Sequence, residues 1–117
     1  MDDFGGFIRK KCMSFAIDIV NLYKHLCEDK KEYVLSKQLL RSGTSIGANL
    51  VEAQNGISQK DFLAKIFISL KETAETEYWI ELLLKTNYIT FEEHNRINSK
   101  CKELYRLFNS IAKSTRS

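Results

Sequence analysis

Apolar residues recur every three or four positions along most of the chain, which is the spacing that lines one face of an α-helix. In residues 6–28 this stripe includes Ile8, Cys12 and Phe15, while the lysines fall mostly outside it. The polar run of residues 28–32 then interrupts the pattern. The sequence therefore predicts an amphipathic helix over residues 6–28, followed by a connection.

The second periodic segment, residues 33–55, contains two glycines at positions that would lie inside a helix. Gly43 and Gly47 are four residues apart and share a face, and each disfavours a helix interior by about 1 kcal/mol relative to alanine. The chain could break at residues 41–45, or a continuous helix could use both glycines to let a neighbouring backbone approach closely. We favour the continuous helix, because the apolar pattern keeps its phase across both glycines. Gly56 is suited to the left-handed position that often ends such a helix.

Two capping signals mark the start of the remaining helices. Ser58 with Asp61, and Thr90 with Glu93, each place a hydroxyl three residues before an acid, as in a capping box. Four helices joined by short connections predict an all-α antiparallel up-down-up-down four-helix bundle that forms one domain. The domain covers residues 1–117, and its helices cover about residues 6–28, 33–55, 59–86 and 91–113.

The third predicted helix has apolar residues on two sides. The main stripe consists of Phe62, Leu63, Ile66, Phe67, Leu70, Ala74, Tyr78 and Leu84. The second group consists of Ile68, Trp79, Leu82 and Leu83. A helix that is apolar on two sides is usually buried on two sides. We therefore predict a homo-oligomer interface at Ile68, Trp79 and Leu83, with burial of Trp79 inside one chain as the alternative.

Composition agrees with long helices and limits the possible chemistry and cellular location of the protein. The chain has 117 residues and no proline, whereas average usage would give about six, and this absence favours uninterrupted helices. Three widely spaced cysteines without CxxC spacing indicate neither a disulfide framework nor a zinc site. An acidic start and the lack of a run of about 20 apolar residues predict a cytoplasmic protein without a membrane segment.

Positive charge is concentrated in the last segment of the chain. The formal net charge is +3, and residues 90–117 carry six Lys or Arg against three Glu. A basic surface of this kind predicts electrostatic contact with RNA or DNA, particularly where an oligomer repeats it. The alternative is a solvated outer face of the helix. The candidate contact residues are Lys100, Lys102, Arg106, Lys113 and Arg116.

Patterns for catalysis and metal binding are weak. A carboxylate-bridged di-metal bundle needs Glu-x-x-His, but neither His25 nor His94 has a glutamate three residues before it. No Ser-His-acid or Cys-His spacing identifies a nucleophile. We therefore predict no catalytic residue, cofactor or metal. The rival prediction is a small-molecule or metal-dependent enzyme whose carboxylates would be Glu72, Glu77 and Glu81.

Two stretches of the chain resemble a known family. Residues 38–53, QLLRSGTSIGANLVEA, resemble the signature of the bacterial four-helix bundle proteins, also called the 23S rRNA intervening-sequence protein family. Residues 70–79, LKETAETEYW, resemble the third-helix pattern of that family. The resemblance implies an antiparallel four-helix bundle that assembles as a ring-like homopentamer. It also implies a structural polar network at Arg41, Asn49, Glu52, Glu72, Glu75 and Glu77.

The resemblance also bears on function. Some members are encoded within insertions in 23S ribosomal RNA genes, and a related branch comprises accessory proteins of diversity-generating retroelements. That branch binds a reverse transcriptase and nucleic acid on a basic pentamer surface, and the resemblance implies no catalytic residues. The residues and the resemblance together predict a non-enzymatic, self-assembling binding or scaffold module that contacts RNA, DNA or a nucleic-acid enzyme. The alternative partner is protein alone, as for an adaptor.

Overall fold

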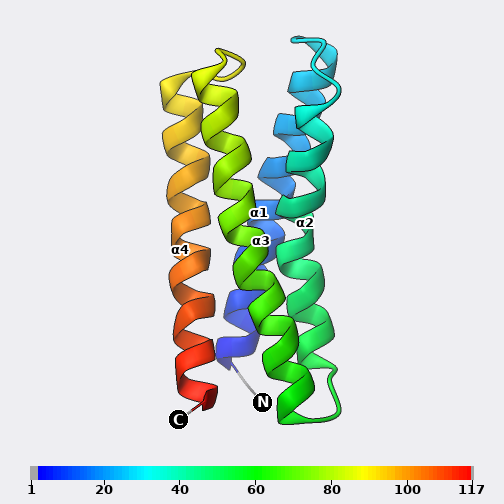
Figure 1. Cartoon of the computed structure of the whole chain (residues 1–117), viewed down its shortest axis with the longest axis vertical. Coiled ribbons are helices and arrows are strands. Elements are labelled where there is room, and N and C mark those ends of the chain that lie inside the picture. The colour runs from blue at the N-terminus through cyan, green and yellow to red at the C-terminus, as the bar shows by residue number, and fades with distance from the viewer. Residues whose placement is uncertain (1–2, 117) are drawn as a thin grey trace.

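Four α-helices run alternately up and down the long axis of the molecule (Figure 1). The computed structural model describes residues 3–116, and the side chains of residues 3–115. The predicted all-α bundle is confirmed, and every helix begins and ends within three residues of its predicted bounds. The helices are α1 (Asp3–Glu28), α2 (Leu35–Gln54), α3 (Gln59–Lys85) and α4 (Phe91–Arg116).

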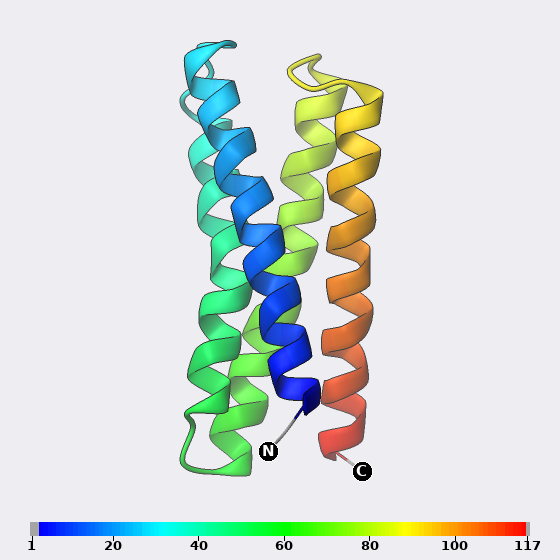
Figure 2. The same cartoon turned by 180° about the vertical axis from the view of Figure 1, so that it is seen from behind.

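Each helix lies beside two others, with α1 diagonally opposite α3. Helix α1 contacts α2 and α4, and α3 contacts the same two helices. Figure 1 shows α3 nearest the viewer, whereas Figure 2 shows α1 nearest the viewer from behind. The outer faces of α1 and α3 therefore lie on opposite sides of the molecule. In the described part of the chain, no helix combines the length and the apolar run that crossing a membrane requires.

Helix α2 continues through both glycines, as predicted, because α1 packs directly against them. A Cβ atom at Gly43 would lie 2.8 Å from Cγ1 of Ile19, and one at Gly47 would lie 3.1 Å from Cβ of Cys12. Side chains in a close-packed interior cannot absorb such overlaps freely. The two glycines therefore allow the close approach of α1 and α2, which offsets their low helix propensity.

The two predicted capping boxes begin α3 and α4. Ser58 Oγ accepts a hydrogen bond from the Asp61 N–H at 3.1 Å. At α4 the box is reciprocal, since Thr90 Oγ1 accepts from the Glu93 N–H at 3.1 Å and Glu93 Oε1 accepts from the Thr90 N–H at 2.8 Å. These bonds satisfy N–H groups that have no partner inside the first helical turn.

The prediction of a left-handed backbone at Gly56 is wrong. No described glycine has a positive φ; the left-handed positions are Lys31 (φ 55°) and Asn87 (φ 69°). After α3, the Asn87 N–H donates to the Leu84 carbonyl at 3.0 Å, and the Tyr88 N–H donates to the Leu83 carbonyl at 2.9 Å. This pair of bonds is a Schellman motif, and asparagine tolerates its left-handed position.

The predicted main stripe of α3 is partly wrong. The residues of α3 that the bundle buries are Ile66, Ser69, Thr73, Thr76, Ile80 and Leu83, whereas Tyr78 is 59% exposed. Three hydroxyls on this buried face find acceptors inside the bundle, and that of Thr73 donates to the Leu70 carbonyl of α3 itself at 2.6 Å. Ser69 Oγ donates to the Ile46 carbonyl of α2 at 2.9 Å, and Thr76 Oγ1 lies 2.9 Å from Ser42 Oγ. Small hydrogen-bonded residues therefore form half of the core face of α3, beside Ile66, Ile80 and Leu83, and an apolar pattern does not reveal that half.

Candidate functional site

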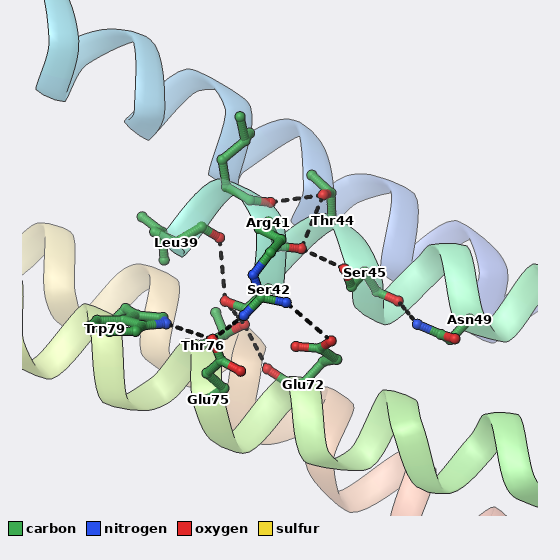
Figure 3. Close-up of polar contacts among 11 residues, drawn as sticks. Leu39, Arg41, Ser42, Thr44, Ser45, Asn49, Glu72, Glu75, Thr76 and Trp79 are labelled. Atoms are coloured by element: carbon green, nitrogen blue, oxygen red, sulfur yellow. Dashed lines mark hydrogen bonds and ion pairs between the residues drawn. The ribbon is translucent and has the colours of Figure 1, made fainter. Parts of the chain in front are cut away.

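A polar cluster of four side chains, Arg41, Glu72, Glu75 and Trp79, lies at the junction of α2 and α3 (Figure 3). The Arg41 guanidinium of α2 reaches both carboxylates of α3. Its Nη1 lies 3.5 Å from Glu72 Oε2, and its Nη2 donates to Glu75 Oε2. The Trp79 indole N–H donates to Glu75 Oε2 at 2.9 Å. We call these four residues the α2/α3 cluster.

The two carboxylates of the α2/α3 cluster differ in their environment. Burial raises the pKa of Glu72, and the positive charge of Arg41 opposes that effect. The hydrogen bond from Trp79 has the largest effect on Glu75 and holds its pKa below the ordinary value. Burial raises this pKa by less than Trp79 lowers it, and the hydrogen bond and charge of Arg41 lower it further. Glu72 Oε1 is buried and has no hydrogen-bond donor among the described residues. Within residues 3–115, Glu72 therefore carries a buried acceptor without a donor.

The other predicted members of the polar network lie in separate contacts. Asn49 donates to the Ser45 carbonyl one turn earlier in α2, and Glu52 pairs with Lys65 at 2.7 Å. Glu77 faces α4, where it pairs with a lysine at 3.1 Å. The structure thus joins Arg41 with two of the five other predicted positions and distributes the remaining three along α2 and the α3–α4 contact.

The basic residues predicted on α4 do not form one cluster. Lys100 pairs with Asp18 of α1, whereas Lys102 pairs with Glu77 of α3, so they face different neighbours. Arg106 is exposed and has no ion-pair partner in the part of the chain that the structure describes. Lys113 is exposed on the same helix, and the side chain of Arg116 lies outside the described residues.

The apolar surface of α3 differs from the predicted interface at one residue. Ile68 is 38% exposed and Trp79 is half-buried, but Leu83 is fully buried in the core and cannot line a surface. The exposed Tyr78 ring packs edge-on against Trp79 with ring centroids 5.1 Å apart. The surface that α3 presents is therefore Ile68, Tyr78 and Trp79, next to the two carboxylates of the α2/α3 cluster.

Helix α1 presents a second apolar surface that the sequence analysis missed. Met13 is 61% exposed and Ile17 is 53% exposed. Lys10 and Lys24 lie seven residues to either side of Ile17, which places them on the same face of α1. We call these four residues the α1 face. The sequence does contain a signal for this surface, because Met13 and Ile17 are four residues apart and lie opposite the main apolar stripe of α1.

A groove of about 590 Å³ between α3 and α4 is lined by Glu77, Glu81, His94, Asn98 and Lys102, among others. The described residues contain no group of three or more His, Cys, Asp or Glu side chains placed to hold a metal ion.

Elsewhere in the bundle, burial raises the pKa of both the Cys12 and the Cys101 thiols to about 12. Such thiols stay protonated and are poor nucleophiles.

Two comparisons with known proteins give matches. A family model described as 23S rRNA-intervening sequence protein matches residues 7–110. A crystal structure from Bacteroides thetaiotaomicron, described as a protein with unknown function from the S23 ribosomal protein family, is 51% identical. The alignment covers 93% of this chain and 97% of that chain, with a TM-score of 0.92. No curated protein matches the sequence.

Proposed function

The chain belongs to the 23S rRNA-intervening sequence protein family, and from that premise we propose that it acts without catalysis as a self-associating binding module. The membership agrees with the resemblance of residues 38–53 and 70–79. The family model and the Bacteroides thetaiotaomicron structure name no reaction. The proposal requires no reacting group, and it assigns the exposed side chains of α1 and α3 to contacts between copies.

One observation carries the proposal: two opposite outer faces of the bundle each expose apolar side chains in the middle of a helix. Met13 and Ile17 lie on α1, and Ile68 and Tyr78 lie on α3, diagonally across the molecule (Figures 1 and 2). Contiguous apolar patches on a small protein commonly mark sites of protein association. Two such faces on opposite sides support contacts on both sides of each chain, as in a homo-oligomer such as a pentamer.

Sedimentation velocity over a range of protein concentrations tests this proposal. We expect the wild-type chain to sediment as an oligomer and Ile17→Glu to sediment as a monomer, since the substitution places a charge in the contact. The matched control is Ile57→Glu in the α2–α3 connection, where Ile57 is 94% exposed and lies on neither face. A wild-type chain that stays monomeric at every concentration, or an Ile17→Glu variant that assembles normally, would contradict self-association.

Contact with RNA or DNA through α4 is the second candidate function. The exposed guanidinium of Arg106 has no acidic partner among the described side chains, and Lys102 lies four residues before it. Lys113, seven residues after Arg106, falls on the same face of the helix. Phosphate groups bind such basic rows through salt-sensitive electrostatic contact, and an oligomer would repeat the row. Contact with a protein partner alone is the alternative for the same exposed surfaces.

A further inference from the structure

The groove between α3 and α4 is lined by two facing rows of polar side chains. Its volume of about 590 Å³ lies within the range of small-molecule sites. Within each row, successive residues are four positions apart and therefore lie one above the other on the same side of the helix. The rows are Glu77, Glu81 and Lys85 on α3, and His94, Asn98 and Lys102 on α4. We call these six residues the α3/α4 groove.

One ion pair shows how the two rows face each other. Glu77 Oε2 lies 3.1 Å from Lys102 Nζ. Because α3 and α4 are antiparallel neighbours (Figure 1), a step of one turn forward along α3 matches a step of one turn back along α4. The next two facing pairs are therefore Glu81 with Asn98 and Lys85 with His94.

Two charges of opposite sign in the α3/α4 groove have no partner. Glu81 and Lys85 are exposed, and neither side chain makes an ion pair or a hydrogen bond with any described residue. A glutamate and a lysine at this spacing often pair with each other, but here they do not. Glu77 and Lys102 neutralise each other, so the groove has no net charge when His94 is neutral. It therefore offers one free carboxylate and one free ammonium group, from residues about 6 Å apart along the helix axis.

Uncharged groups beside these two charges add matching contacts. Asn98 Oδ1 is buried without a donor among the described residues, so the N–H groups of the Asn98 amide face the groove and can donate to an anion. The Tyr78 ring is 59% exposed and lines the groove three residues before Glu81. The face of an aromatic ring attracts a cation. Leu84 lines the groove between the two charged positions and is partly buried.

We infer that the α3/α4 groove binds a small zwitterion of the ω-amino acid class, with its ammonium group on Glu81 and its carboxylate on Lys85. A ligand with a single charge would neutralise only one of the two groups. The separation of Glu81 and Lys85 favours a ligand whose charged groups are held apart by several methylenes, which Leu84 contacts, over an α-amino acid, whose charged groups share one carbon. The site is complete within one chain, so it goes beyond the proposed self-association and does not depend on it.

An NMR titration of the isotope-labelled chain with γ-aminobutyrate tests the inference. We expect saturable shifts of the backbone amides of α3 and α4 along the groove. Butylamine and butyrate each carry only one of the two charged groups, and each should bind about tenfold more weakly, the effect of losing one charge-assisted hydrogen bond. The Ile17→Glu variant should bind γ-aminobutyrate like the wild type, since the residues that line the groove belong to α3 and α4.

Variants of the two free charges assign the two ends of the ligand. Glu81→Gln and Lys85→Met should each weaken γ-aminobutyrate binding about tenfold. Glu81→Gln should leave butyrate binding unchanged, and Lys85→Met should leave butylamine binding unchanged. The matched controls are Lys24→Met and Glu28→Gln, which change an exposed lysine and an exposed glutamate four residues apart on α1. The controls should bind like the wild type, and circular dichroism verifies the fold of every variant.

The outcomes separate this inference from the proposed function. Shifts that do not saturate would overturn the inference, as would butylamine or butyrate that binds as tightly as γ-aminobutyrate. Equal effects of the groove variants and of the α1 controls would overturn it as well, since any exposed lysine and glutamate at this spacing would then act alike. None of these results changes the sedimentation of the chain, so self-association stands or fails on its own measurement.

Discussion

Glu32 is a buried glutamate whose carboxylate accepts hydrogen bonds from three backbone N–H groups at the start of α2, at 2.7 to 3.1 Å. Burial raises the pKa of this carboxyl, but the N–H groups of Leu35, Ser36 and Val34 together outweigh burial and hold the pKa below its ordinary value. The stabilisation is therefore complete above the ordinary pKa of glutamate. It is lost as the pH falls through the lowered pKa of the folded state.

We expect Glu32→Gln to lower the free energy of unfolding by about 1 kcal/mol near neutral pH, which is typical of a lost N-terminal cap. The difference from the wild type should shrink in acid, because the wild-type carboxylate is then protonated. Urea unfolding in neutral and in acidic buffer measures both values. Glu28→Gln, at an exposed position at the end of α1, is the control; an equal deficit for Glu32→Gln at both pH values would argue against a charged cap.

Single residues were predictable where their partners lie nearby in a regular pattern. Ser58 and Thr90 cap their helices from the position that the capping box assigns. Glu32 lies outside that pattern. Its carboxylate meets the N–H groups of α2 only because the chain turns at Lys31, whose backbone is left-handed. Glu72 shows the same limit, since the burial of its Oε1 without a hydrogen bond depends on the packing of α2 beside α3.

At the scale of helices, the contact between α1 and α2 depends on the absence of a side chain at Gly43. We expect Gly43→Ala to destabilise the protein by about 1–3 kcal/mol through overpacking, although alanine favours the helix by about 1 kcal/mol. The new Cβ would meet Ile19 at 2.8 and 2.9 Å on both of its branches, and a β-branched side chain cannot rotate away easily.

Urea unfolding of two matched glycine variants measures this effect. Gly6→Ala is the control, since a Cβ at exposed Gly6 would meet nothing within 4 Å, and it should raise the free energy of unfolding by up to about 1 kcal/mol. If Gly43→Ala were as stable as Gly6→Ala, the close approach of α1 and α2 would not depend on this glycine.

The helices themselves were predictable, and the inward face of α3 was not. Apolar spacing locates a helix whose core face is apolar, as in α1, where Ile8, Cys12 and Phe15 are buried. On α3 the buried face includes Ser69 and Thr76, whose hydroxyls bond to α2. The hydroxyl of Thr76 also bonds to the Glu72 carbonyl of its own helix, but Ser69 depends on an acceptor in another helix, which the local sequence does not display.

At the scale of the whole molecule, binding of RNA through α4 should depend on assembly as well as on charge. We expect the affinity to fall as salt rises, with a weaker dependence for Arg106→Glu with Lys113→Glu, because fewer phosphate contacts release counterions. Fluorescence anisotropy with a structured RNA at several salt concentrations measures both slopes. The monomeric Ile17→Glu variant should bind more weakly than the wild type, because it presents the basic row once.

Binding of RNA that is absent at low salt, or that is insensitive to the α4 charges, would count against this role.

Surface charge was the least predictable feature of the molecule. Residues 90–117 are basic in sequence, yet Lys100 and Lys102 are paired with acids of α1 and α3. Net charge along a segment does not reveal which neighbour faces each side chain.

The buried hydroxyls of α3 have one more consequence, for the alignment of the helices along their axes. Apolar contacts are non-directional, whereas the bond from Ser69 to the Ile46 carbonyl and the Ser42–Thr76 contact require one axial position of α3 against α2. The thiol of Cys101 adds a bond to the Thr73 carbonyl at 3.3 Å from α4. A shift of one turn, about 5.4 Å, would break all three contacts. Ser69 would lose its acceptor, whereas Thr76 and Ser42 also donate to carbonyls of their own helices. These three polar contacts therefore fix the axial register of α3 against α2 and α4.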